Sequence, residues 1–173
     1  KLDAMVALAK PKLAVMVDDL DRDAWLMGVR NGVVNLRTGA FREATPEDLI
    51  TKIAAVEYDR EASCPVWEAM LHRCMGGKVE LIEFLQRAMG YTLTGLTREQ
   101  VFFFMHGGGD NGKSKISNAL REIMGGYAIS SQPEVIMKQR SANASGPTPE
   151  LARLAGTRFV AMVETEDGQR LAE

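Results

Sequence analysis

Several features are scarce or missing in this sequence, and each absence excludes a class of protein. The 173 residues include two cysteines, too few for a disulfide framework and consistent with a reducing cytoplasm. No apolar run is long enough to span a membrane, and no charged-then-apolar leader is present, so we expect neither a membrane partner nor secretion. The net charge of -2 provides no global field that attracts nucleic acid. Any contact with DNA must therefore come from a local patch.

The first part of the sequence carries helical and hairpin signals. Residues 1–20 place apolar side chains at roughly helical spacing, interrupted by Pro11. Two short β-prone runs, residues 32–36 and 40–43, flank a turn in which Gly39 is expected at the left-handed position. This segment therefore predicts a β-hairpin.

Further helices are predicted downstream of the hairpin. One is expected to begin at Thr45, the N-cap of the segment TPEDLITKIAAV. Two more are predicted over residues 65–75 and 79–89, the second ended by Gly90. We therefore expect residues 1–96 to form a mainly helical domain with a β-hairpin.

From residue 97 onward the pattern changes to that of an α/β protein. Residues 101–106, VFFFMH, form an unbroken apolar run, which is typical of a strand buried on both faces of a parallel sheet. The pattern G-x-x-x-x-G-K-[ST] follows directly at residues 107–114, and the next ten residues, KISNALREIM, predict a helix. A strand, a glycine-rich turn and a helix in this order predict a P-loop.

The residue types of this turn suit the binding of a nucleotide triphosphate. Backbone N–H groups and a helix N-terminus can surround phosphate oxygens where side chains are absent, and Lys113 adds a positive charge for the β and γ phosphates. The Ser114 hydroxyl is a ligand for Mg²⁺. The predicted nucleotide-binding residues are Gly107, Gly108, Gly109, Asp110, Asn111, Gly112, Lys113 and Ser114.

A second buried strand is predicted over residues 158–163, and acidic residues follow it. Glu164 is the expected Mg²⁺ residue and Glu166 a candidate to orient the attacking water. Both point to the same side of an extended chain. Together with Lys113, these two acids form the predicted catalytic set. Trp25 and Trp67 are interpreted as core or half-buried residues rather than as a stacking platform for bases.

Four segments carry a family resemblance: NGVVNLRTGAF, CPVWEAML, ELIEFLQRAMGYTLTGLTREQVFFFMHGGGDNGKSK and ELARLAGTRFVAMVETEDGQRL. Their order and spacing resemble the phage and plasmid primase family, whose C-terminal part is a superfamily 3 helicase of the poxvirus primase-helicase type. The resemblance covers most of the chain from about residue 31 and is more specific than the P-loop alone.

The resemblance implies an ATP-driven replicative DNA helicase that requires Mg²⁺. It implies a homo-oligomeric ring such as a hexamer, single-stranded or forked DNA as partner, and an association with a primase. It also implies the cytoplasm of a bacterial host, with a phage or prophage as the source. Residues 1–96 would precede the motor, and residues 97–173 would be the first half of an AAA+-like parallel-sheet domain.

Only some of the residues that the family uses for ATP hydrolysis have a counterpart in this sequence. Gly107, Gly112, Lys113 and Ser114 match its phosphate loop and Glu164 its acidic position, but its sensor asparagine, arginine finger and DNA-binding hairpin lie beyond that position. Because the sequence begins without methionine and stops at Glu173, we expect a truncated fragment that is inactive alone. Two alternatives stay open: a P-loop kinase or NTP-hydrolase, and a non-catalytic nucleotide-binding assembly module.

Overall fold

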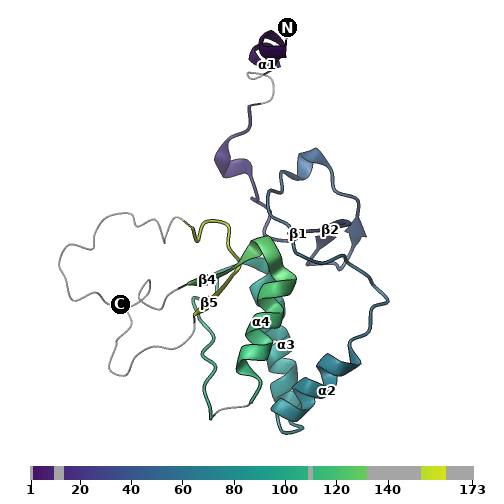
Figure 1. Ribbon diagram of the computed structural model, residues 1–173, viewed down its shortest axis with the longest axis vertical. Helices are drawn as coiled ribbons and strands as arrows, with labels where there is room; N and C mark the ends of the chain where they lie inside the picture. The colour runs from purple at the N-terminus through teal and green to yellow at the C-terminus, as the bar shows by residue number, and fades with distance from the viewer. Residues whose placement is uncertain (1, 10–13, 109–110, 132–152, 163–173) are drawn as a thin grey trace, which may run out of the picture.

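A computed structural model describes residues 2–9, 14–108, 111–131 and 153–162 (Figure 1). The described chain is a mixed α/β structure with four α-helices, two small sheets and three short 3-10 helices. The α-helices are α1 (Leu2–Ala9), α2 (Pro65–Cys74), α3 (Val79–Thr94) and α4 (Lys113–Met124). The strands are β1 (Leu26–Val29), β2 (Gly32–Asn35), β3 (Phe41–Arg42), β4 (Ala128–Ser131) and β5 (Phe159–Met162). The 3-10 helices are Val17–Asp19, Pro46–Asp48 and Gly125–Tyr127.

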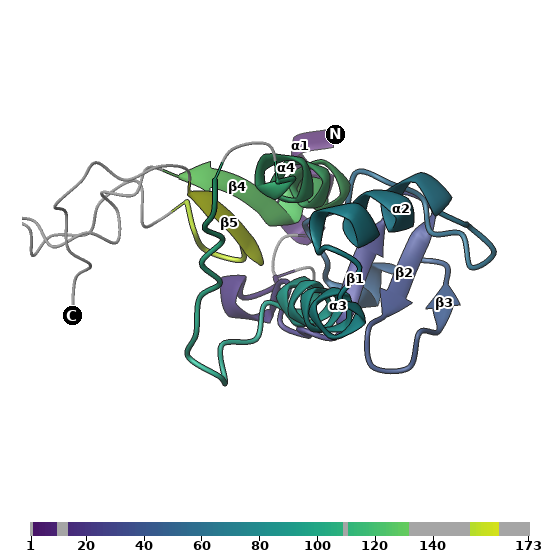
Figure 2. The ribbon, with the colours of Figure 1, turned by 90° about the horizontal axis from the view of Figure 1, so that it is seen from below.

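The two sheets lie on opposite sides of α3 and α4 (Figure 2). One sheet is antiparallel with the order β1-β2-β3, and the other pairs β4 with β5 in parallel. Helix α3 contacts β1, whereas α4 contacts β4 and β5. None of the described helices is long and apolar enough to cross a membrane.

The predicted hairpin is confirmed as β2 and β3. Val33 pairs with Arg42, and Gly39 in the connecting turn has a φ of 71°, the left-handed value that glycine adopts without strain. The structure adds β1, which pairs with β2 in the register Met27 to Val34. The sequence reasoning did not predict β1, a four-residue strand that begins directly after a turn at Asp23.

The helix predicted from Thr45 is wrong beyond its first turn. Thr45 does act as N-cap in a reciprocal capping box with Asp48, but the turn is a 3-10 helix that stops at Leu49, whose φ is 49°. The following residues run extended against β1, where the Ala54 N–H donates to the Gly28 carbonyl at 2.8 Å. Burial of Ala54 and this hydrogen bond to β1 override the helical periodicity.

The two helices predicted next are both present, and one of them is longer than expected. Helix α2 begins as predicted and ends at Cys74, one residue before the predicted end. Helix α3 continues through Gly90 and ends at Thr94, with Gly95 in the left-handed region at a φ of 66°. The prediction that Gly90 ends this helix is therefore wrong. A single interior glycine costs a helix about 1 kcal/mol, and burial of Ala88 and Thr94 on the packed face offsets that cost.

Residues 101–106 do not form the predicted buried strand. Phe102, Phe103 and Phe104 are 66%, 46% and 76% exposed, and this segment makes no backbone ladder within the described chain. The strand predicted near the acidic residues is confirmed as β5, but its partner is β4, which the sequence did not predict. An apolar run becomes a buried strand only when a neighbour pairs its N–H and C=O groups.

The core joins elements from both parts of the chain. Its buried members are Met27, Val29, Val34, Ala54, Met124 and Tyr127. The first four precede residue 96 and the last two follow it, so one core connects the β1-β2-β3 sheet to the end of α4. The domain boundary near residue 96 stays a prediction.

A partly buried arginine links these elements through backbone carbonyls. The Arg158 guanidinium donates to the carbonyl oxygens of Leu93 at 2.9 Å and Leu26 at 2.8 Å, and lies 4.5 Å from the centroid of the Tyr127 ring. The Tyr127 hydroxyl in turn accepts the Gly28 N–H at 3.0 Å. Burial lowers the pKa of Arg158 and raises the pKa of Tyr127. This cluster fastens α3, β1 and the start of β5 together.

Replacing Arg158 by methionine is expected to lower the free energy of unfolding by about 3 kcal/mol. The substitution keeps a similar apolar stem but leaves the Leu26 and Leu93 carbonyls without their charged donor, and each such bond contributes about 1.5–3 kcal/mol. Urea unfolding monitored by circular dichroism measures the change. The matched control is Arg98→Met at an exposed site, for which we expect a change within about 0.5 kcal/mol. Equal effects in the two variants would contradict the linking role of Arg158.

Candidate functional site

The glycine-rich turn leads into α4 with the backbone geometry of a cradle. Gly107 has a φ of 141° and Gly112 a φ of 83°, both in the region that favours glycine. Gly112 is the N-cap of α4, and Lys113 is the first residue of that helix. The helix predicted directly after the motif is therefore confirmed as α4. The first N–H groups of α4 have no partner within the helix and face the turn. Gly109 and Asp110 lie outside the described residues.

The Lys113 ammonium is folded onto the turn. Its Nζ donates to the Gly107 carbonyl at 2.8 Å, the Gly108 carbonyl at 3.2 Å and the Asn111 Oδ1 at 2.8 Å. These oxygens are neutral, so the positive charge is not cancelled by an acid at these contacts. The Lys113 ammonium thus bridges residues at the two ends of the turn.

Helix α2 touches the turn from outside the motif. A Cβ built on Gly112 would lie 2.5 Å from Cys74 Sγ and 3.7 Å from Met70 Sδ, and the two sulfur atoms are themselves 3.5 Å apart. A real Cβ does not approach a heavy atom that closely, so glycine is required both by space and by backbone angle. The sequence reasoning missed this contact because the two residues are far apart in the chain and no local pattern links them.

Of the other residues predicted for the nucleotide site, the structure places some beside the glycine-rich turn and does not describe the rest. Ser114 follows Lys113 in the first turn of α4 and is exposed, and Asn111 contacts the Lys113 ammonium. Glu164 and Glu166 lie outside the described residues, although β5 carries the chain to Met162 immediately before them. The roles of both acids, and of every residue of the phosphate loop, stay predictions.

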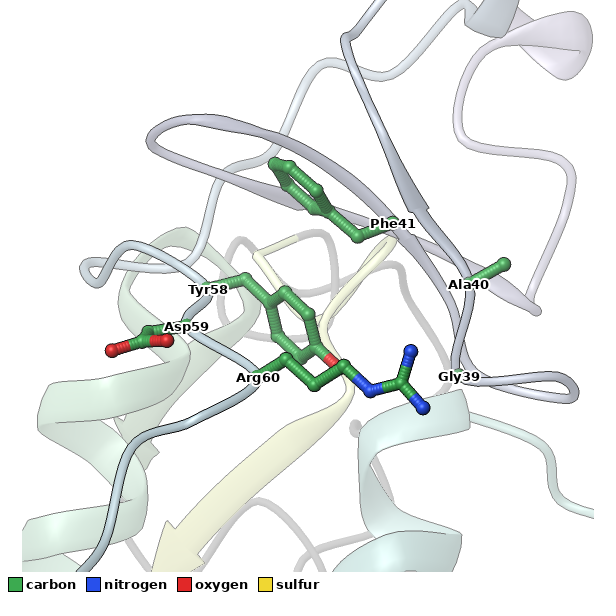
Figure 3. A pocket seen from close by; sticks show the side chains of 6 residues that line it. All are labelled: Gly39, Ala40, Phe41, Tyr58, Asp59 and Arg60. Atoms are coloured by element: carbon green, nitrogen blue, oxygen red, sulfur yellow. The ribbon is translucent and has the colours of Figure 1, made fainter.

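A separate hollow lies beside the β2–β3 turn (Figure 3). Its volume is about 430 Å³, and the rings of Phe41 and Tyr58 stack at one wall with centroids 5.4 Å apart. The carboxylate of Asp59 points away from the guanidinium of Arg60 in this view and accepts the Glu61 N–H at 2.9 Å. This hollow shares no lining residue with the glycine-rich turn and is a distinct place on the molecule.

The two tryptophans are both partly buried, as the sequence predicted. The guanidinium of Arg37 lies 4.5 Å from the centroid of the Trp25 ring, so this tryptophan does have a basic neighbour. Trp67 lies on α2 and lines a groove between α2 and α4. Lys138 and Arg140, in a loop considered for partner binding, lie outside the described residues.

Comparison with known proteins gives two kinds of match. Residues 1–76 match the family described as "D5 N terminal like". Proteins bearing the name "Putative helicase" match more of the chain: that of Acanthamoeba polyphaga mimivirus is 29% identical over 145 residues, covering 81% of this chain and 15% of the relative. That of Invertebrate iridescent virus 6 is 29% identical over 140 residues, covering 79% of this chain and 14% of the relative.

These matches show that the chain is similar to viral proteins named as putative helicases. The matches support a D5-type primase-helicase family, the type of family that the four sequence segments resemble. It spans about one seventh of the length of the curated relatives that it matches. The family match ends at residue 76, so it includes α2 and Cys74 but not the glycine-rich turn that Cys74 contacts.

Replacing Gly112 by alanine is expected to destabilise the chain by about 2 kcal/mol or more. An alanine in the left-handed region costs about 1–2 kcal/mol, and its Cβ would also displace Cys74 Sγ. The additional change Cys74→Ala removes the sulfur and leaves the Cys74 Cβ at 3.4 Å, so the double variant should recover part of the loss. Denaturant unfolding of the four proteins in this cycle measures the coupling.

Gly90→Ala is the matched control for this cycle. Gly90 lies inside α3 with nothing within 4 Å of a built Cβ, so alanine should stabilise the chain by about 0.5–1 kcal/mol. Additive effects of Gly112→Ala and Cys74→Ala would show that α2 does not press against the turn. The bulkier Gly112→Val variant is expected to abolish nucleotide binding, because its side chain would collide with Cys74 and Met70 on α2 and push the turn out of place.

Proposed function

We propose that this chain is the ATP-binding part of a replicative superfamily 3 DNA helicase, which couples ATP hydrolysis to DNA unwinding. The observation that carries the proposal is the Lys113 ammonium held at the start of α4 by the carbonyls of the glycine-rich turn. The match to the "D5 N terminal like" family and the viral relatives named as putative helicases support the same conclusion.

The residues of the turn fit a nucleotide phosphate on physical grounds. Side chains are absent at Gly107 and Gly112, where a Cβ would lie 2.5 Å from Asn111 Nδ2 and from Cys74 Sγ respectively. A side chain at either position would therefore press on a neighbouring side chain and shift the turn, and the N-terminus of α4 adds the positive end of a helix dipole. Backbone N–H groups, a helix N-terminus and one ammonium together suit an anion such as phosphate.

Each residue of the loop has a defined task under this proposal. Lys113 exchanges its bonds to the Gly107 and Gly108 carbonyls for bonds to phosphate oxygens, which are stronger because both partners are charged. Ser114 and Glu164 would hold Mg²⁺, which supplies charge neutralisation on the phosphates when bound. Glu166 would orient the attacking water. The α/β part from residue 97 would then be the front of an AAA+-like P-loop domain.

The whole helicase requires partners that this proposal also names. We propose that the longer protein acts as a homo-oligomeric ring on single-stranded or forked DNA, together with a primase. In such a motor the phosphate loop binds ATP in the ground state, whereas acceleration of phosphoryl transfer needs further charge on the transition state. Binding of ATP and its turnover can therefore be tested separately.

Lys113→Ala is expected to weaken binding of Mg·ATP to the chain by about tenfold or more. A charge-assisted contact to phosphate contributes about 1.5–3 kcal/mol, and about 1.4 kcal/mol corresponds to tenfold in affinity. Isothermal titration calorimetry measures the affinity, and circular dichroism verifies the fold. The control is Lys78→Ala, an exposed lysine next to α3, which should leave the affinity unchanged.

The helicase assignment is tested on the longer protein that contains this chain. We expect ATP hydrolysis that single-stranded DNA stimulates and that Lys113→Ala removes. Phosphate transfer to a small acceptor would indicate a kinase instead, and ATP binding with neither activity would indicate an assembly module. An unchanged ATP affinity in Lys113→Ala would show that the glycine-rich turn is not the site.

A further inference from the structure

The glycine-rich turn supplies an acceptor for every N–H of the Lys113 ammonium. A protonated lysine has three N–H donors and no acceptor. Two of these donors bond to the carbonyls of Gly107 at 2.8 Å and Gly108 at 3.2 Å, and the third bonds to the Asn111 Oδ1 at 2.8 Å. A phosphate oxygen can therefore bond to this ammonium only by displacing one of the acceptors that the turn already provides.

Asn111 is the one side chain among these three acceptors. The two carbonyls belong to the backbone and keep their positions while the turn keeps its shape, whereas the Asn111 Oδ1 can leave by rotation about the bonds of its own side chain. The bond from Lys113 to Asn111 is also partly buried, and the two bonds to the carbonyls are exposed. Because water competes less with a buried bond, Asn111 holds the ammonium more firmly than either carbonyl does.

The Asn111 amide lies between the first glycine of the motif and the lysine. A Cβ built on Gly107 would lie 2.5 Å from the Asn111 Nδ2, while the Oδ1 of the same amide accepts from Lys113. The amide is neutral, and within the described residues Lys113 forms no salt bridge. A phosphate oxygen carries charge and is a stronger acceptor for an ammonium than a neutral amide oxygen. Exchange of the amide for a phosphate is therefore favourable.

We infer that Asn111 is a positioning residue that competes with phosphate for the Lys113 ammonium. It holds the cation on the turn, and the phosphate of the nucleotide displaces it. The inference rests on the proposed function, because that function supplies the displacing ligand. It reverses the effect expected of a residue that contacts the nucleotide: Asn111 lowers the affinity for phosphate, since its bond to Lys113 must break first. The effect is the same for ATP and for inorganic tripolyphosphate, which share the phosphate chain.

Two substitutions of Asn111 should change phosphate affinity in opposite directions. Asn111→Ala removes the competing acceptor, and we expect both Mg·ATP and Mg·tripolyphosphate to bind about threefold more tightly or better. Alanine suits the backbone there, because Asn111 is not among the residues with positive φ. Asn111→Asp places a carboxylate beside Lys113 that pairs with the ammonium and repels phosphate, so both ligands should bind about tenfold more weakly or worse.

Isothermal titration calorimetry measures these affinities, and circular dichroism verifies that each variant is folded. The matched control is Asn118→Ala, an exposed asparagine on the same helix α4, for which we expect affinities within about twofold of the unaltered chain. If alanine at position 111 prevents folding, Asn111→Asp and Asn111→Ser carry the same test, since serine also removes the amide oxygen that Lys113 contacts.

A second measurement tests the Asn111–Lys113 bond without any nucleotide. Ammonium protons held in hydrogen bonds exchange slowly with water, and NMR of the chain labelled with ¹⁵N-lysine follows this exchange for each lysine. Loss of the Lys113 signal in Lys113→Arg assigns it. In Asn111→Ala the Lys113 protons should exchange about twofold faster or more, and in Asn118→Ala they should not.

Faster proton exchange together with tighter binding of both polyphosphates in Asn111→Ala is the result expected. Unchanged exchange in this variant would overturn the inference whatever the affinities are. Faster exchange with unchanged or weaker binding would also overturn it, because Asn111 would then shape the turn or contact the ligand instead of competing with it. Failure of both the unaltered chain and Asn111→Ala to bind either ligand would overturn the proposed function, and the displacement with it.

Discussion

The contact of Arg158 with two backbone carbonyls and an aromatic ring is the interaction on which the described fold depends most. Its partners Leu26 and Leu93 lie in β1 and α3, and Tyr127 immediately precedes β4. A buried carbonyl without a donor is costly, so this guanidinium satisfies groups that secondary structure alone leaves open. Because Tyr127 also accepts the Gly28 N–H, the two sheets are connected through a single cluster.

Helix α4 extends this organisation to the glycine-rich turn. At one end it begins at Lys113 directly after the glycine-rich turn, and at the other Met124 is completely buried in the core. Ile116, 2% exposed, lies between these ends. A helix whose far end is fixed by packing holds its N-terminal N–H groups in a constant direction, and preorganised donors bind an anion with less loss of entropy. The core therefore contributes to the site without touching it.

Helix α2 brings the family-matched part of the chain to the same loop. Cys74 and Met70 approach Gly112 closely, and the match to the "D5 N terminal like" family includes both residues. The part of the chain that identifies the family and the part that carries the motif are thus in physical contact. The side chain of Cys74 occupies the space that a Cβ at Gly112 would need, so this packing requires glycine at that position.

The sequence by itself determined the features that depend on neighbours in the chain. Gly39 and Gly112 at positive φ, the N-cap at Thr45 and the start of α4 after the motif all follow from local backbone preferences. The hairpin and the start of α2 were predictable for the same reason. The resemblance to a primase-helicase family also came from the sequence alone, because four segments carry it in order and spacing.

The tertiary structure alone decided the features that depend on a distant partner. The segment after Thr45 lies extended because β1 offers a carbonyl to Ala54. Residues 101–106 are exposed and pair with no strand of the described chain, whereas β5 pairs with β4. Both segments carry apolar patterns that suit more than one conformation, and a pattern cannot say which partner is in reach. The contact of Cys74 with Gly112 has the same origin: packing between helices sets it, and no local signal in the sequence encodes it.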